Sequence, residues 1–106
     1  MDINEKKQQF NIAFNLHKEG NIKEAKILYE KILDNFPNDA EILNLKGLCE
    51  LSFKEYESAE KSISKAISIK CKDFFFESLA RVYSESQQYK KEQEILLSAE
   101  KLFGLN

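Results

Sequence analysis

The chain has 106 residues, of which 42% are hydrophobic and 32% charged, and its formal net charge is −2. This length is typical of one domain, and the apolar content is too high for an intrinsically disordered chain. The slightly acidic balance argues against a nucleic-acid-binding domain, which usually carries a basic surface.

The N-terminal third is predicted to form two helices joined by a tight turn. Apolar residues recur at helical spacing over residues 3–18, and Asp2 is placed to cap the start of this helix. Gly20 supplies the positive φ at which a helix ends. A second helix is predicted over residues 22–36, because Pro37 disfavours the helical conformation in the residue before it.

The middle third repeats this arrangement. Asn38, with Glu41 three residues later, predicts the capped start of a third helix. A turn at residues 54–55 separates it from a fourth helix, which begins near Tyr56 and carries apolar residues at helical spacing as far as Ile67.

The C-terminal third contains a last pair of predicted helices. Asp73 is a candidate cap for the fifth helix, and residues 87–88 form the turn that follows it. The sixth helix is predicted over residues 89–103. Gly104 followed by Leu105 is typical of a left-handed helix end with an apolar contact.

Small residues recur at a fixed interval through these helices. Ala13, Gly47 and Ala80 are 34 and 33 residues apart, each midway along the first helix of a pair. Small side chains there allow two helices to approach closely. No single pair can bury its apolar face alone, so we expect three antiparallel pairs to stack around one continuous core. The second helices keep the same interval at Ile32, Ala66 and Ala99.

Two motifs connect this interval with a known repeat. They are Phe76-x-x-Leu79-Ala80-x-x-Tyr83, and Ala25-x-x-x-Tyr29 followed by Pro37. Both resemble the tetratricopeptide repeat, whose pattern is Trp-x-x-Leu-Gly-x-x-Tyr, then Ala-x-x-x-Phe, then Pro. The middle repeat departs from the pattern at Lys46 and Glu50, and the third departs at Glu92, where the other repeats have Ala.

The resemblance implies an all-α fold, a right-handed α-solenoid of three antiparallel helix pairs that covers residues 1–106 as one domain. Its repeats are expected at about residues 6–39, 40–72 and 73–106. Members of this family usually bind a peptide or helix of a partner protein in a concave groove lined by the first helix of each pair. By the resemblance, the groove candidates here are Lys7, Phe10, Asn11, Phe14, His17, Asn44, Leu48, Leu51, Phe74, Glu77 and Arg81.

The resemblance does not extend to the chaperone-binding members of the family. Those members hold a C-terminal carboxylate with Lys, Asn and Arg at set positions of the groove. The matching positions here hold Phe10, Phe14, Leu45, Phe74 and Ser78. We therefore expect a rather apolar groove, which suits an amphipathic helix or an extended segment with apolar anchors.

No pattern in the chain predicts catalysis, a metal site or a cofactor. His17 is the only histidine and has no second ligand or nucleophile near it in the sequence. Besides naming it as a groove candidate, we interpret it as a residue near the C-terminal end of the first helix, where its side chain interacts favourably with the helix dipole. Cys49, between Leu48 and Leu51, is interpreted as a small buried hydrophobe. Cys71 lies in a turn between two lysines, and we predict no role for it.

The run Phe74-Phe75-Phe76 leaves two interpretations open. Adjacent residues on a helix differ by about 100° around its axis, so the three rings cannot all point inward. If Phe76 is in the core, at least one neighbour faces a groove or a partner. Alternatively, this first helical turn is wedged beneath neighbouring helices.

The sixth helix is predicted to present an uncovered apolar surface. Repeat arrays usually finish with a polar capping helix, and exposed apolar patches mark interfaces. We expect either a homodimer through the last helix pair or docking onto a further domain. The candidate residues for self-association are Leu97, Leu102, Phe103 and Leu105.

The sequence also predicts where the protein is found. No run approaches the roughly 18 apolar residues of a membrane span, and residues 1–5 lack the basic and apolar regions of a signal peptide. A stapled secreted domain of this size would usually carry more than two cysteines. We expect a cytoplasmic protein with no membrane or nucleic-acid partner.

Three functions are consistent with these observations. The first is a non-catalytic module that binds a protein or peptide partner. The second is an accessory repeat region of a larger enzyme, because Leu43-x-Leu45-x-Gly47-Leu48-x-x-Leu51 resembles repeats that precede bacterial glycosyltransferase domains. The third, RNA binding by a pentatricopeptide array, requires a basic surface and a 35-residue unit, and the chain has neither.

Overall fold

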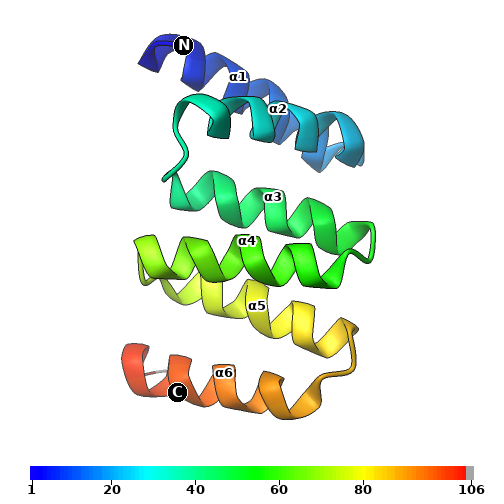
Figure 1. Cartoon of the computed structure of the whole chain (residues 1–106), viewed down its shortest axis with the longest axis vertical. Coiled ribbons are helices and arrows are strands. Elements are labelled where there is room, and N and C mark those ends of the chain that lie inside the picture. Colours follow the sequence, from blue (N-terminus) through cyan, green and yellow to red (C-terminus); the bar gives the residue numbers. More distant parts are fainter. Residues whose placement is uncertain (105–106) are drawn as a thin grey trace.

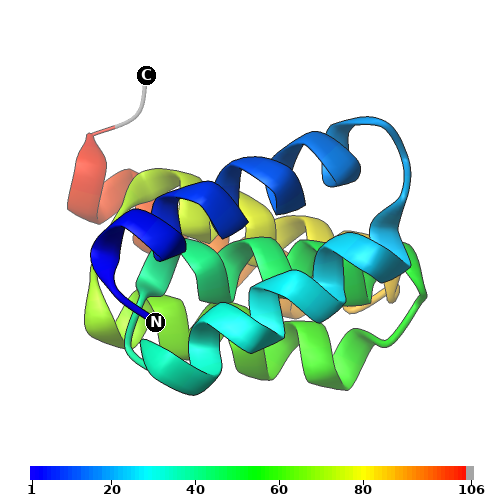
Figure 2. The ribbon, with the colours of Figure 1, turned by 90° about the horizontal axis from the view of Figure 1, so that it is seen from above.

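The computed structural model describes residues 1–104, and this range forms six α-helices and no strands. The helices follow one another along the long axis of a body of 39 × 25 × 22 Å (Figure 1). Seen from above, α1 and α2 run side by side in opposite directions (Figure 2). The predicted right-handed α-solenoid of antiparallel helix pairs is confirmed. The helices are α1 (Ile3–Lys18), α2 (Ile22–Asn35), α3 (Ala40–Ser52), α4 (Tyr56–Ile69), α5 (Asp73–Glu85) and α6 (Tyr89–Phe103).

The turns within the three helix pairs have the same backbone conformation. Gly20, Lys54 and Gln87 occupy equivalent positions and all have positive φ, at 90°, 62° and 63°. Only glycine adopts this conformation without a steric cost, so Lys54 and Gln87 are strained positions that the packing of each pair maintains. At the end of α6, Gly104 has the predicted left-handed conformation with φ 63°, whereas Leu105 lies outside the described residues.

The predicted N-terminal cap is confirmed at α1 but not at α3 or α5. The Asp2 carboxylate accepts the Glu5 N–H at 2.8 Å, as predicted. The predicted cap Asn38 is wrong, because the extended residue directly before α3 is Asp39, whose carboxylate accepts the Ile42 N–H at 3.1 Å. Asp73 is also not a cap, since it is already the first residue of α5.

The core lies between the paired helices and between neighbouring pairs. Ala13, Ala25 and Ala59 are completely buried, as close helix packing requires. Glu92, at the position equivalent to Ala25 and Ala59, is half-buried. The largest fully buried side chains are Tyr29, Phe75, Ile32, Ile63, Val82 and Cys49.

A buried polar network explains the departures of the middle repeat from the family pattern. Glu50 is only 3% exposed, and its carboxylate accepts hydrogen bonds from the Ser62 hydroxyl at 2.7 Å and from Lys46 at 3.1 Å. Lys46 also donates to the Ser62 hydroxyl at 3.3 Å, and Lys26 of α2 lies 4.0 Å from the same carboxylate. Two cations and a hydroxyl therefore satisfy a carboxylate at a position that is usually Tyr in this repeat.

Replacing Gly47 with Ala is expected to lower the free energy of unfolding by about 1–3 kcal/mol. A Cβ at this position would lie 2.5 Å from Cγ1 of Ile63 on α4. This overpacking outweighs the roughly 1 kcal/mol by which Ala favours a helix over Gly. Because Ile63→Ala removes the obstructing atom, Gly47→Ala should cost much less in that background. Urea unfolding of both single variants and the double variant measures this coupling, and additive losses would contradict it.

Candidate functional site

A cavity of about 590 Å³ lies between the N-terminal halves of α1 and α3, beside the loop that joins α2 to α3. We call it the α1–α3 groove. Its walls combine apolar side chains from three elements with charged groups at the edge. The lining residues are Ile3, Lys6, Lys7, Phe10, Asn11, Phe36, Asp39, Glu41 and Ile42.

Helical spacing and one proline place the apolar walls of this groove. Ile3, Lys7 and Phe10 are separated by four and three residues, so they share one face of α1. Phe36 follows α2 directly before Pro37. It packs against the core cluster that contains Tyr29 and Ile42. The floor on α3 contains Ile42, which is 2% exposed. The groove therefore depends on the α1–α2 pair being docked on α3.

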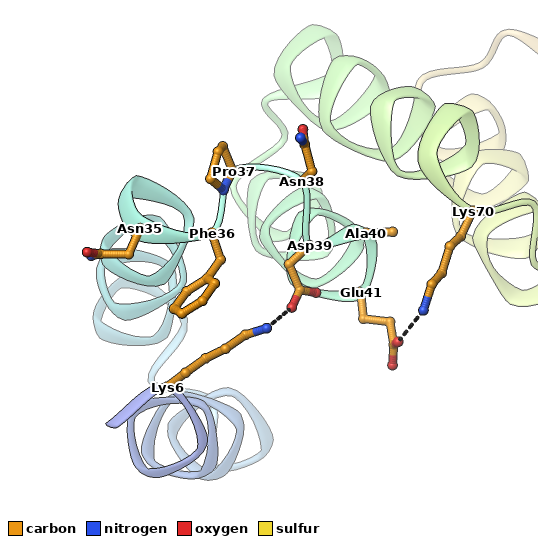
Figure 3. Close-up of a pocket in the computed structure, with 9 residues that line it drawn as sticks. All are labelled: Lys6, Asn35, Phe36, Pro37, Asn38, Asp39, Ala40, Glu41 and Lys70. Carbon is orange, nitrogen blue, oxygen red and sulfur yellow. Dashed lines mark ion pairs between the residues drawn. The ribbon is translucent and has the colours of Figure 1, made fainter. Parts of the chain in front are cut away.

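An ion pair crosses the edge of the groove. Lys6 of α1 forms an ion pair with Asp39, the residue that caps α3, and its ammonium lies 4.6 Å from the centre of the Phe36 ring (Figure 3). Glu41 pairs with Lys70 at 3.8 Å and with Lys72 at 3.6 Å. Asp39 consequently holds α1 and the start of α3 together.

A second cavity of about 420 Å³ adjoins the α1–α3 groove, and Figure 3 shows the residues that line it. It shares Lys6, Phe36, Asp39 and Glu41 with the α1–α3 groove. The rest of its lining comes from the loop after α2 and the end of α4. These additional residues are Asn35, Pro37, Asn38, Ala40 and Lys70.

Only some of the predicted groove residues lie together on an open surface. Lys7, Phe10 and Asn11 line the α1–α3 groove. Phe14 is 37% exposed and stacks on Phe10 with ring centres 5.7 Å apart, and the Lys18 ammonium lies 5.2 Å from the centre of the Phe14 ring. These residues extend the apolar strip of α1 towards its C-terminal end.

The predicted groove positions of α3 need correction. Leu51 is 2% exposed and packs in a core cluster with Leu79 and Val82 of α5. Leu48 is half-buried against the same cluster. Asn44 is 3% exposed, and its Oδ1 has no hydrogen-bond partner among the described residues. The stacking of α5 on α3 thus buries positions that remain open on α1.

His17 also differs from its predicted place in the groove. Its Nδ1 shares a hydrogen bond of 3.1 Å with the Tyr29 hydroxyl and lies 3.9 Å from the Cys49 sulfur. Burial lowers the pKa of His17 below its usual value, which favours the neutral ring. Burial, with a smaller contribution from the Glu50 charge, raises the pKa of the Cys49 thiol to about 12. His17 therefore links three helices, and the interpretation of Cys49 as a buried hydrophobe is confirmed.

The structure resolves the alternatives for the three adjacent phenylalanines. Phe75 is completely buried, and Phe76 is 4% exposed and packs edge-on against Phe103 at 5.4 Å between ring centres. Phe74 is 40% exposed, with the Lys72 ammonium 5.6 Å from its ring centre. The other groove candidates of α5, Glu77 and Arg81, are exposed, and Arg81 pairs with Glu85 at 3.0 Å.

The described residues that were predicted for self-association point in different directions around α6. Leu97 and Leu102 are 57% and 60% exposed, but five residues of helix place them about 140° apart around α6. Phe103 is half-buried and packs against the ring of Phe76. Leu105 lies beyond the residues that the structure describes. The three described residues therefore point in different directions around α6, and self-association through them stays a prediction.

Sequence reasoning missed most of the groove walls. The missed residues on α1, Ile3 and Lys6, share a helical face with Phe10, so spacing alone could have found them. No local signal brings Phe36 and Ile42 towards α1, because they belong to other helices. The remaining missed residues are Asp39 and Glu41.

Neither a metal-binding group nor a membrane-spanning helix occurs among the described residues. In this range, no group of His, Cys, Asp or Glu side chains is arranged to hold a metal ion. No helix within residues 1–104 combines the length and apolar character needed to cross a membrane.

Comparison with solved structures shows the same fold in several proteins. The Yersinia enterocolitica type III secretion chaperone SycD, in complex with a peptide of the translocator YopD, has a TM-score of 0.89 and 17% identity over 96% of this chain and 79% of that chain. The first TPR of Spaghetti (RPAP3), bound to the HSP90 peptide SRMEEVD, has a TM-score of 0.87 and 15% identity, covering 100% and 87%. The O-GlcNAc transferase of Thermobaculum terrenum, as a K341M mutant, has a TM-score of 0.86 and 20% identity, covering 93% of this chain but 19% of that chain.

At these identities the structural likenesses show the tetratricopeptide-type fold alone. A search of curated proteins finds no match. A protein-family model described as "Coatomer epsilon subunit" matches residues 8–103, which is nearly the whole chain. The chain therefore belongs to the coatomer epsilon subunit family.

Proposed function

We propose that this chain is a non-catalytic protein-interaction module that binds a segment of a partner protein in the α1–α3 groove. The observation that carries the proposal is the cavity of about 590 Å³ with Ile3, Phe10 and Phe36 in its walls. Apolar walls with a few polar groups at the edge are typical of sites that bind apolar anchor residues. The SycD and RPAP3 structures, each with a bound peptide, support the proposal by analogy of fold.

The charges of the groove favour an apolar or mixed segment over a purely acidic tail. Lys6 is paired with Asp39. Glu41 is paired with Lys70 and Lys72, so most charges at the edge of the groove are already balanced. Lys7 is the remaining cation of the lining. We infer that the partner segment has one or two apolar anchors, either as an amphipathic helix or as an extended strand.

Replacing Ile3 with Gln is expected to weaken binding of such a segment by about tenfold, because it removes an apolar anchor site from the groove wall. Ile3 is 65% exposed, so the fold should tolerate the change. The probe is a peptide of roughly 12 residues selected from a phage-displayed random library on the wild-type chain, and calorimetry measures its affinity.

The matched control is Ile12→Gln on the same helix. Ile12 is 50% exposed but lies outside the cavity lining, about 180° from Ile3 around α1. This variant should bind the selected peptide like the wild type. Equal affinities for all three proteins, or selected peptides without apolar anchors, would reject the α1–α3 groove as the binding site.

The proposal also includes a cytoplasmic location and a protein rather than nucleic-acid partner. Within the described residues, Cys49 and Cys71 are free thiols, which supports a reducing compartment. The net charge of −2 supports a protein partner. The possible homodimer remains a prediction, which sedimentation of the pure chain would test.

A second candidate is an accessory repeat region of a larger enzyme. The observation that favours it is the fold of the Thermobaculum terrenum O-GlcNAc transferase, in which the matched part makes up 19% of that chain. The mass of the native gene product distinguishes this candidate. A product of about the mass of this chain, 12.4 kDa, would exclude it.

A further inference from the structure

Equivalent positions on the second helices are covered in the first two pairs and open in the third. Tyr29, Ile63 and Leu96 occupy this position on α2, α4 and α6. Tyr29 and Ile63 are both completely buried, whereas Leu96 is 44% exposed. Tyr29 lies in a core cluster with Ile42 of α3, and Ile63 lies in one with Val82 of α5. The next helix of the array therefore covers this position wherever such a helix exists.

The surface around Leu96 is apolar at its centre and acidic at its sides. Tyr89 on the same face of α6 is 58% exposed. Glu92 and Glu100 are one helical turn before and after Leu96, and each lies about 40° from it around the helix. We define the α6 face as Tyr89, Glu92, Leu96 and Glu100.

No cation of the described structure balances these carboxylates. The lysines of α6 lie at least about 120° from Leu96 around the helix. On the neighbouring helix, Arg81 is engaged by Glu85, and Glu77 adds another exposed carboxylate. The α6 face therefore favours a ligand that is both apolar and basic.

The face of α1 that a second copy would stack on α6 in a head-to-tail array does not have that chemistry. The positions of α3 that cover α2 are Ile42, Leu45 and Cys49, and their equivalents on α1 are polar and exposed. A head-to-tail contact would thus place amides on Leu96. Antiparallel pairing of two α6 faces centred on Leu96 would bring Glu92 of each copy near Glu100 of the other, which is unfavourable. The three polar equivalents on α1 are Gln8, Asn11 and Asn15.

We propose that the α6 face binds an amphipathic helix of a partner protein. The apolar side of this partner helix should resemble that of α5, which packs on α4 with Phe75, Leu79 and Val82 at helical spacing. The partner helix carries Lys or Arg beside these apolar residues, where they meet Glu92 and Glu100. This second binding surface is independent of the α1–α3 groove and lies at the opposite end of the solenoid (Figure 1).

The test uses two synthetic helical peptides and fluorescence anisotropy. Both peptides copy the apolar spacing of α5, and one has Lys at the flanking positions where the other has Glu. The Lys peptide should bind saturably, and the Glu peptide should bind at least about tenfold more weakly. Leu96→Gln should lower the affinity for the Lys peptide by about tenfold. The double variant Glu92→Lys with Glu100→Lys should reverse the preference between the two peptides.

The matched control is Leu97→Gln, because Leu97 is 57% exposed but points about 100° away from Leu96. This variant should bind the Lys peptide like the wild type. Circular dichroism checks that each variant retains its helices. Absence of saturable binding, or equal losses in Leu96→Gln and Leu97→Gln, would overturn the proposal. Sedimentation showing dimers that Leu96→Gln abolishes would also overturn it, in favour of a second copy.

Discussion

Replacing Phe75 with Ala is expected to lower the free energy of unfolding by about 3–5 kcal/mol, because the change opens a cavity in the core. The Phe75 side chain is completely buried in a cluster with Leu43 of α3 and Ala66 of α4. It therefore connects the last helix pair to the middle pair, and urea unfolding followed by circular dichroism measures the loss.

The adjacent Phe74 provides the control. It is the same residue type in the same helical turn, but it is 40% exposed. Phe74→Ala should cost no more than about 1 kcal/mol, because much of the ring is already in water. Similar losses in the two variants would mean that the first turn of α5 is rotated relative to the described structure.

Replacing Glu50 with Ala is expected to cost about 3–5 kcal/mol, as is typical when one member of a buried ionic network is removed. The change leaves Lys46 and the Ser62 hydroxyl without their acceptor in a largely buried site. It also removes a carboxylate that lies 4.0 Å from Lys26 of the preceding pair. Glu50→Gln should cost less, because its amide oxygen can still accept one of these hydrogen bonds.

The matched control for this network is Glu85→Ala. Glu85 also pairs with a cation four residues away on its helix, but both side chains of the Arg81–Glu85 pair are exposed. Exposed pairs of this kind contribute about 0–1 kcal/mol, so the free energy of unfolding should hardly change. A loss for Glu50→Ala as small as that for Glu85→Ala would show that water reaches the network.

The candidate site illustrates how far helical spacing can carry a prediction. Spacing correctly groups Lys7, Phe10 and Asn11 on one face of α1, because i, i+3 and i+4 neighbours share a face in any helix. The same reasoning treats Asn44 and Leu51 on α3 as equally open, although both are buried. Spacing describes one helix at a time, whereas exposure depends on which helices are stacked on it.

The sequence by itself determined the six helices, their pairing and the positive φ at Gly20, but not the positive φ at Lys54 and Gln87. These features depend on contacts within one helix or between neighbours in the chain, so Gly20, Pro37 and the 34-residue interval of small residues were sufficient. The caps of α3 and α5 were not predicted correctly, because Asn38 and Asp39 are adjacent and chemically similar and Asp73 is already the first residue of α5.

Only the tertiary structure decided which of several equivalent residues face solvent. Tyr29, Ile63 and Leu96 have the same place in their repeats, yet the first two are buried and Leu96 is 44% exposed. The α1–α3 groove likewise exists because Phe36 and Ile42 are brought beside α1 from other helices. Burial depends on the packing of distant segments, which local periodicity does not encode.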